Sequence, residues 1–265
     1  MDDSEQIQSL IRHLGISRNQ IVTRQVDGEI RVVELYLSEM RLVEIPSSLK
    51  LRLPYLEKID LQLNDLNTVP DHFFAKMPNL KEVNLSRNRL ECIPKQLFWN
   101  NRELEKLFLG ENRIRQIEEG TFNHLRNLRI LDLHRNALNE IRSNLVKTLD
   151  LDILDLSNNE ISSIPDGFFQ GMEVARLNLR GNRLFSFDLM QLPLSLVELN
   201  LSENNLVTLK IGSKKELYSL KKLDLSGNEL TEVPSNLINL CPNLEEINLE
   251  DNPIDFSFRK KIRIK

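Results

Sequence analysis

Histidine and cysteine are the side chains best suited to acid–base, nucleophilic or metal chemistry, and this chain of 265 residues has four histidines and two cysteines. The histidines are His13, His72, His124 and His134. They fall in different units of the repeat described below and mostly on different faces, and the chain lacks His-Glu-x-x-His, Gly-x-Ser-x-Gly and phosphate-binding glycine motifs. Cys92 and Cys241 lack the Cys-x-x-Cys spacing of zinc and redox sites. The sequence therefore predicts no catalytic residue, no metal and no cofactor, and we expect a protein that is not an enzyme.

Asparagine recurs at a nearly constant spacing within one pattern, apolar-x-x-apolar-x-apolar-x-x-Asn-x-apolar, as in LKEVNLSRNRL. The pattern asparagines are Asn64, Asn88, Asn112, Asn136, Asn159, Asn182, Asn204, Asn228 and Asn252, spaced by 22 to 24 residues. An earlier unit, VVELYLSEMRL, fits the pattern with Met40 in the asparagine position. Because a side-chain amide both donates and accepts hydrogen bonds, it can pair backbone groups of a buried turn. We therefore interpret these amides as structural.

The elements that carry these residues are short strands with one apolar and one polar side. In the unit at residues 80–90, Val83 and Leu85 share one side of the strand, whereas Glu82 and Asn84 share the other. A single strand of this kind cannot bury its apolar side, so successive units must stack. We expect strands centred on Leu35, Ile59, Val83, Leu107, Leu131, Leu154, Leu177, Leu199, Leu223 and Ile247.

These units resemble leucine-rich repeats of about 24 residues, and as residues 32–256 they cover most of the chain. The resemblance implies an α/β fold: a right-handed solenoid, or horseshoe, with a concave parallel sheet and short helical, 3₁₀ or irregular convex segments. About ten residues beyond the pattern asparagines, the sequence predicts a hydrophobic spine on the convex side. Its members are Phe74, Phe98, Phe122 and Phe169, with Val146, Leu192 and Ile238 in the corresponding places.

The two ends of the array differ from its repeats. Residues 1–31 predict an N-terminal cap, formed by a helix with apolar residues from Ile7 to Leu14 and a β-hairpin that turns at Asp27-Gly28. Residues 257–265 form a short basic C-terminal tail. The basic tail either stays solvated or docks on an acidic partner or a following domain.

Composition bears on partners and compartment. The 35 basic and 39 acidic residues give a formal net charge of −4, which favours neither nucleic acid nor an anionic membrane as partner. No stretch is long and apolar enough to span a membrane, the start of the chain is acidic rather than signal-like, and cysteine-rich flanks are missing. We therefore expect a cytoplasmic (intracellular) protein that is monomeric by itself.

The concave face offers the candidate site. Its exposed columns hold mostly Asp, Asn and charged residues, except for Tyr36, Phe108, Ile130 and Ile153. Exposed apolar groups surrounded by basic residues are typical of protein interfaces. The predicted partner-binding residues are Tyr36, Phe108, Ile130, Ile153, Arg129, His134, Arg135, Arg176 and Arg180. The alternative is that these positions tolerate any residue, or that neighbouring side chains pack on one another.

The function that this sequence predicts is a non-enzymatic protein–protein interaction module, acting as adaptor, scaffold or regulatory subunit in signalling. One alternative is an extracellular recognition or adhesion ectodomain, and another is the recognition part of a larger enzyme. The partner is a protein in each interpretation, because a long shallow face suits proteins better than small molecules.

Overall fold

The computed structural model describes residues 3–45, 51–143, 145–147, 149–211 and 216–254. It divides into two compact units, residues 1–131 and residues 132–265, which we describe separately. The sequence predicted one continuous array, and the division follows from its architecture. Each repeat of a solenoid contacts only its neighbours, so that no single core spans a long array.

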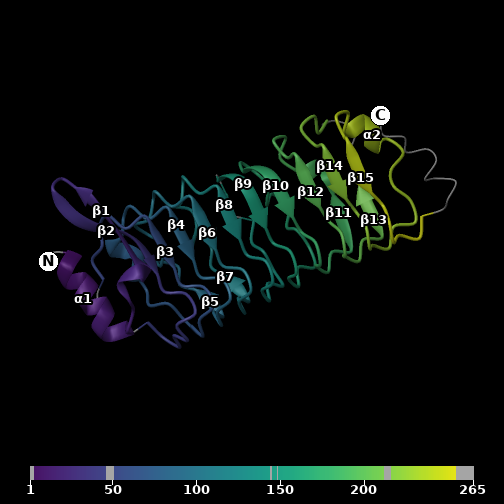
Figure 1. The fold of residues 1–265 in the computed structure, drawn as a ribbon. Coiled ribbons are helices and arrows are strands. Elements are labelled where there is room, and N and C mark those ends of the chain that lie inside the picture. The colour runs from purple at the N-terminus through teal and green to yellow at the C-terminus, as the bar shows by residue number, and fades with distance from the viewer. Residues whose placement is uncertain (1–2, 46–50, 144, 148, 212–215, 255–265) are drawn as a thin grey trace. The chain divides into compact units, whose positions relative to one another are not determined.

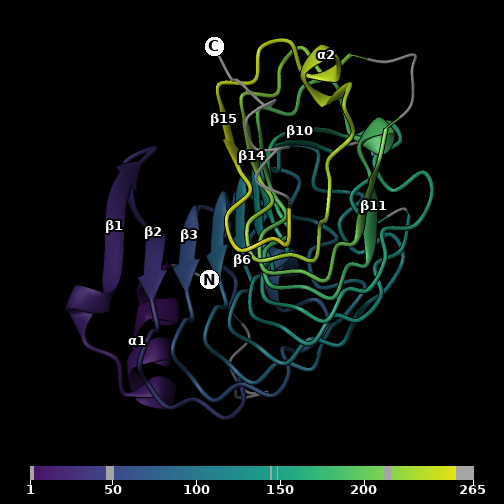
Figure 2. The same ribbon diagram turned by 90° about the vertical axis from the view of Figure 1, so that its right-hand side faces the viewer.

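Unit 1 begins with helix α1 (Asp3–Leu14), the 3₁₀ turn η1 (Arg18–Gln20) and an antiparallel hairpin of β1 (Ile21–Val26) and β2 (Glu29–Tyr36), seen at the purple end of the chain in Figure 2. Leu10 is fully buried, and the buried Asp3 carboxylate accepts a hydrogen bond from the Val32 backbone N–H at 2.7 Å. The helix is thus fastened to the first strand of the repeats. The boundaries of this cap stay a prediction.

The remaining strands of unit 1 continue from β2 in the order β3 (Lys58–Asp60), β4 (Glu82–Asn84) and β6 (Lys106–Phe108) (Figure 1). They are parallel and paired in register, so that Glu34, Lys58, Glu82 and Lys106 form one row. β8 (Ile130–Asp132) ends unit 1 at Leu131. The opposite side of the unit carries η2 (Phe73–Lys76) and the short parallel pair β5 (Cys92–Ile93) and β7 (Gln116–Ile117).

Unit 2 repeats this arrangement with five parallel strands: β9 (Asp150–Asp155), β10 (Glu173–Asn178), β12 (Glu198–Asn200), β14 (Lys222–Asp224) and β15 (Glu246–Asn248). Opposite them lie β11 (Ser186–Asp188), paired in parallel with β13 (Thr208–Lys210), and the turns η3 (Leu189–Gln191) and α2 (Leu237–Leu240). All ten predicted strand centres fall within strands of the two units, and the predicted solenoid fold with a parallel sheet is confirmed.

The pattern asparagines pair buried backbone groups as predicted. In unit 1, Asn88 donates from Nδ2 to the carbonyl oxygens of Leu61, at 2.9 Å, and Leu85, at 3.0 Å, and its Oδ1 accepts the Leu66 N–H. In unit 2, Asn204 repeats the pattern with Leu179, Leu201 and Leu184. Each amide therefore ties its own turn to the preceding one.

The predicted spine is present in both units, with one correction. The rings of Phe74 and Phe98 stack in unit 1 with centroids 5.5 Å apart. The other predicted members Phe122, Val146, Phe169 and Leu192 are buried as well. Ile238 is only half-buried, because α2 turns its neighbour Leu237 into the core instead. The predicted basic tail lies outside the described residues.

Candidate protein-binding face

The exposed face of the parallel sheet follows from strand parity. In the three-residue strands from β3 to β14 the middle residue is buried and the first and third are half-buried or exposed, as with Glu82, Val83 and Asn84 in β4. In β15 the middle residue, Ile247, is half-buried. The exposed positions form two columns along the sheet, one of mostly charged residues and one of mostly Asp and Asn. The sequence predicted that the binding residues of β2, β6, β8, β9 and β10 lie in these columns, and the strands of the structure have them there.

The Asp and Asn column has a structural role that the sequence did not disclose. Asn200 Oδ1 accepts hydrogen bonds from the backbone N–H and hydroxyl of Ser202, at 2.9 and 2.7 Å. Asp224 Oδ1 does the same for Ser226. One side-chain oxygen thus shapes the turn after each strand, and the second polar atom of the group remains on the exposed face. At Asn200 and Asp224 the column offers an amide donor and a carboxylate acceptor to a ligand.

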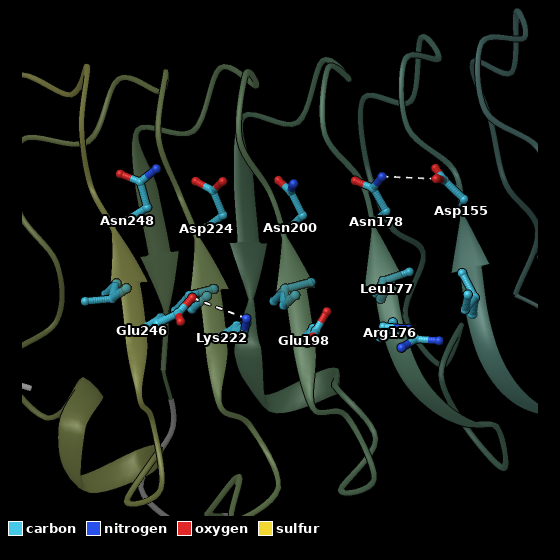
Figure 3. A pocket seen from close by; sticks show the side chains of 14 residues that line it. Asp155, Arg176, Leu177, Asn178, Glu198, Asn200, Lys222, Asp224, Glu246 and Asn248 are labelled. Carbon is cyan, nitrogen blue, oxygen red and sulfur yellow. Dashed lines mark hydrogen bonds and ion pairs between the residues drawn. The ribbon is translucent and has the colours of Figure 1, made fainter.

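The face is hollowed in unit 2 by a groove of about 640 Å³ across β9, β10, β12, β14 and β15 (Figure 3). Its floor is made by the buried middle residues, among them Leu177, Leu199 and Leu223. Its walls carry the two exposed columns. Figure 3 shows Arg176, Glu198, Lys222 and Glu246 along one wall and the Asp and Asn column along the other.

Charges in the groove are only partly compensated. Lys222 pairs with Glu246 at 3.5 Å, and Asn178 donates to Asp155 Oδ2 at 3.1 Å. Arg176 and Glu198 are register partners on β10 and β12, yet neither forms an ion pair within the described residues. Since the lining holds four carboxylates and two cations, the groove has a net negative charge. It is suited to a ligand that presents hydrogen-bonding and cationic groups.

The sequence-predicted residues Ile153 and Arg176 are brought together in this groove. They are register partners on β9 and β10, and both line it. Ile153 is half-buried and Arg176 is exposed. An apolar side chain beside an unpaired guanidinium is the combination that the sequence predicted for an interface.

Arg180, also predicted, is already occupied by an acidic neighbour. Its Nε and Nη2 donate to the two carboxylate oxygens of Glu203 at 3.0 and 2.6 Å. These hydrogen bonds lower the pKa of Glu203 and raise the pKa of Arg180. His134 contacts Asp132, with 2.6 Å between Nδ1 and Oδ1. Arg180 and His134 therefore present compensated or hydrogen-bonded groups rather than open ones.

The other predicted residues belong to unit 1 or to the boundary between the units. Phe108 is half-buried beside its register partner Asn84, and Ile130 is half-buried on β8, where its N–H and that of Arg129 donate to the Glu105 carbonyl oxygen. The predicted patch is thus divided, with Phe108 and Ile130 in one unit and Ile153 and Arg176 in the other. Arg135, in unit 2, is exposed after β8.

Tyr36 lies at the start of a charged row in unit 1. Its hydroxyl donates to Glu34 at 2.5 Å, and Lys58 Nζ lies 5.6 Å from its ring centroid. The pKa of Tyr36 is raised, mainly by the hydrogen bond to Glu34 and to a smaller extent by burial. Lys58 in turn contacts Glu82 at 2.8 Å, and Lys106 contacts Glu82 at 3.4 Å. The alternation of acidic and basic residues in this column was visible in the sequence, but their pairing was not predicted.

Among the residues that the structure describes, no group of three or more His, Cys, Asp or Glu side chains could hold a metal ion. The described helices include none with the length and apolar character needed to cross a bilayer. Both cysteines are free thiols, with Cys92 exposed and Cys241 buried.

Comparison with known proteins identifies the repeats. A leucine-rich repeat family model matches residues 30–90, 54–114, 102–150 and 195–254, and a second leucine-rich repeat model matches residues 150–172. Transforming growth factor beta activator LRRC33 of Danio rerio is 37% identical over 86 residues, which are 31% of this chain and 13% of that protein. The chain thus spans only a small part of the relative it matches.

Solved structures share the fold. TLR13, in its complex with ssRNA13, aligns with a TM-score of 0.72 and 23% identity over 85% of this chain and 37% of its own. The leucine-rich effector YopM of Yersinia pestis aligns with a TM-score of 0.61 and 23% identity over 83% of this chain and 55% of its own. A chain of the octameric complex of Latrophilin 3, Unc5D and FLRT2 gives a TM-score of 0.61 and 23% identity, covering 89% of this chain and 79% of its own.

The expected cytoplasmic location is wrong. The relative LRRC33 and the structural neighbours TLR13 and FLRT2 are membrane or secreted extracellular leucine-rich repeat proteins. The expectation relied on features missing from the sequence, namely paired cysteines and an apolar leader. A repeat array with a sizeable core folds without disulfides in any compartment, so two free thiols do not determine where it works.

Proposed function

The chain belongs to the leucine-rich repeat family, and we propose that it is a non-enzymatic module that binds a partner protein on the exposed face of its parallel sheet. A rigid face of stacked strands provides a preformed surface, so that binding costs little ordering entropy. Its breadth suits a protein better than a metabolite. Adaptor, scaffold and regulatory subunit are the roles that such a module fills.

The groove of unit 2 is the observation that carries this proposal. It combines a half-buried isoleucine, Ile153, with two charges that form no ion pair within the described part of the chain, Arg176 and Glu198, beside a row of side-chain amides and carboxylates. Apolar anchors surrounded by polar groups are the composition of protein interfaces. A partner segment that lies along the groove would bury Ile153, pair with Arg176 and Glu198, and satisfy the free atoms of the Asn column.

Unit 1 by itself carries another part of the predicted binding residues. Phe108 and Ile130 replace the polar residues that neighbouring strands place in the same columns, and strand parity points both away from the core. Tyr36 and Arg129 complete this part, while His134, Arg135 and Arg180 belong to unit 2. Core packing requires none of these side chains on the exposed face, which supports a role in recognition.

The relatives support recognition outside the cell as the setting of this function. LRRC33 is named as an activator of transforming growth factor beta, and the FLRT2 structure is a complex of several proteins. We extend to this chain only the class of function, which is recognition of a protein ligand.

A comparative binding experiment tests the proposal. The full chain is immobilised and exposed to extracellular and cellular fractions of its source, beside a variant with Ile153→Asp and Arg176→Ala. The matched control carries Lys95→Ala and Arg102→Ala, which remove exposed charges from unit 1 outside the sheet. We expect a protein that wild type and control retain and the groove variant loses. Equal retention by the groove variant would contradict binding on this face.

A further inference from the structure

A second hollow lies away from the exposed sheet face, where α1 meets the first repeats of unit 1. It has a volume of about 460 Å³ and is lined by Asp3, Arg31, Arg52 and Lys76, with Pro54, Ala75 and Pro78. Three cationic side chains from separate segments converge there: Arg31 from β2, Arg52 from the following loop and Lys76 from η2. None of them belongs to the proposed protein-binding face.

Asp3, the single carboxylate in the lining, is committed to internal contacts. It is 1% exposed, its Oδ2 accepts the Val32 N–H at 2.7 Å, and its Oδ1 lies 3.8 Å from Arg31 Nη1. Arg31 therefore balances the charge of Asp3. Arg52 and Lys76 are exposed and form no ion pair with any other described residue. The hollow thus has two uncompensated positive charges.

Arg31 is held in place while part of its guanidinium stays available. The guanidinium carbon lies 5.1 Å from the centroid of the Tyr55 ring, which fixes the plane of the group. Its buried Nε has no hydrogen-bond acceptor among the described residues. Nε itself is shielded, so a ligand in the hollow would reach the remainder of the Arg31 side chain, which is 23% exposed. The hollow also adjoins the first residue of α1, the positive end of that helix.

We propose that this hollow binds a tetrahedral oxyanion, the group shared by phosphate, sulfate and their monoesters. Planar guanidinium groups of arginine match two oxygens of such an anion, and a lysine ammonium adds a point charge. Arg31 and Arg52 supply the guanidinium groups and Lys76 the ammonium. A carboxylate ligand presents two oxygens in one plane and matches three converging cations less completely.

Calorimetric titration of the full chain tests this site. Sodium sulfate and sodium phosphate are titrated separately at pH 7.5, with sodium chloride holding the ionic strength constant. The variant Arg52→Ala/Lys76→Ala is compared with Lys95→Ala/Arg102→Ala, which removes the same charge from exposed positions elsewhere in unit 1. We expect the first variant to raise the dissociation constant at least about tenfold, and the control to change it less than about twofold. Thermal melting of both variants verifies that they fold.

The two anions distinguish the chemical source. Because the dianion of inorganic phosphate takes up a proton between pH 7.5 and 5.5, phosphate binding that weakens over this range, with no response to sulfate, assigns the site to phosphate groups. Sulfate binding that is unchanged over this range assigns it to sulfate groups. Failure of both anions to bind, or equal weakening in the control variant, would overturn the proposal. None of these outcomes depends on the protein-binding face.

Discussion

The side-chain amide of Asn204 donates a hydrogen bond to the carbonyl oxygen of Leu179, 2.9 Å away and 25 residues earlier in the chain. The same Nδ2 also donates to Leu201 O at 3.1 Å. A single amide thereby joins two consecutive turns of unit 2. The relationship recurs at the pattern asparagines from Asn64 to Asn112 in unit 1 and from Asn159 to Asn252 in unit 2, so the turns within each unit are held by side chains as well as by the sheet.

Replacing this amide should lower stability. Asn204 is 7% exposed, and Asn204→Ala removes one of the two amide donors to each of the Leu179 and Leu201 carbonyl oxygens and leaves the Leu184 N–H without its acceptor. We expect the free energy of unfolding to fall by about 1 to 3 kcal/mol, as for other buried groups that lose their partners. Urea denaturation measures the change. Asn205→Ala removes a neighbouring amide that is exposed, and should change stability by less than about 0.5 kcal/mol.

The helix α1 should stabilise the first repeats. Leu10 is fully buried, and Leu10→Ala should cost about 2 to 5 kcal/mol, the usual range for a buried leucine. Hydrogen exchange of amides in β2 locates the effect, since this strand contacts the helix. Gln8→Ala, at an exposed position of the same helix, is the control. Equal protection of β2 in wild type and Leu10→Ala would show that the helix is dispensable.

Glu82 should make stability depend on pH below neutrality. Burial raises the pKa of this carboxyl, but the contacts with Lys58 and Lys106 more than reverse that effect, so its pKa lies below the ordinary value. The ionised form is therefore favoured by folding. Its contribution is present above the ordinary pKa of about 4.3 and is lost as the pH falls through the lower, folded-state pKa.

The corresponding variant is Glu82→Gln. Chemical denaturation at pH 7 should show a loss of about 0.5 to 1 kcal/mol, and the difference from wild type should shrink as the pH falls below the ordinary pKa of about 4.3. Glu91→Gln changes an exposed glutamate that forms no ion pair with described residues, and serves as the control. A deficit that persists unchanged at pH 3 would mean that Glu82 acts through packing rather than through its charge.

The two thiols should differ in reactivity. Cys241 is 1% exposed, and burial raises its pKa to about 11, whereas Cys92 is exposed. At pH 8 a thiol reagent should modify Cys92 rapidly and Cys241 only upon unfolding. Because the pKa of Cys241 is higher in the folded than in the unfolded state, the free energy of unfolding should also fall as the pH rises from about 9 towards 11. Labelling of Cys92→Ser, followed by mass spectrometry, isolates the Cys241 rate.

The periodicity of the repeats allowed the positions of the strands to be predicted from the sequence. All ten strand centres from Leu35 to Ile247 lie in strands because each is specified by alternating residues that only one register can bury. Ile238 was wrongly predicted to be a buried residue of the spine. Its repeat contains the short helix α2, in which the neighbouring Leu237 is buried instead. Local irregularity of this kind is decided by packing, which a repeat pattern does not contain.

The site was less predictable, for a physical reason. Strand parity identified which side chains are exposed, but not which charges are already paired. Arg176 and Arg180 are both exposed arginines, yet Arg180 is paired with Glu203 from the next turn. The hollow formed by Arg31, Arg52 and Lys76 is still further from prediction, because it exists only where α1 packs beside the first repeats. Contacts between elements with no common period leave no sequence signal.

The contrast between these two arginines provides the sharpest test of the proposed binding face. Arg176 lines the groove beside Ile153 and has no ionic partner among the described residues, whereas Arg180 donates two hydrogen bonds to Glu203. Arg176→Ala should therefore weaken binding of an isolated partner protein by about 1 to 3 kcal/mol, within the range of interface hot spots. Arg180→Ala should weaken it by less than about 0.5 kcal/mol, since its charge is already compensated.

Phe108→Ala then shows whether unit 1 takes part in the same interaction. Phe108 is half-buried on the exposed face, so its loss should leave the melting temperature nearly unchanged and weaken binding by about 1 to 3 kcal/mol if the partner reaches both units. Titration calorimetry of the partner with the three variants decides between the outcomes. Loss with Arg176→Ala alone confines the partner to the groove of unit 2. Wild-type affinity in both Arg176→Ala and Phe108→Ala would place the binding site away from the sheet face.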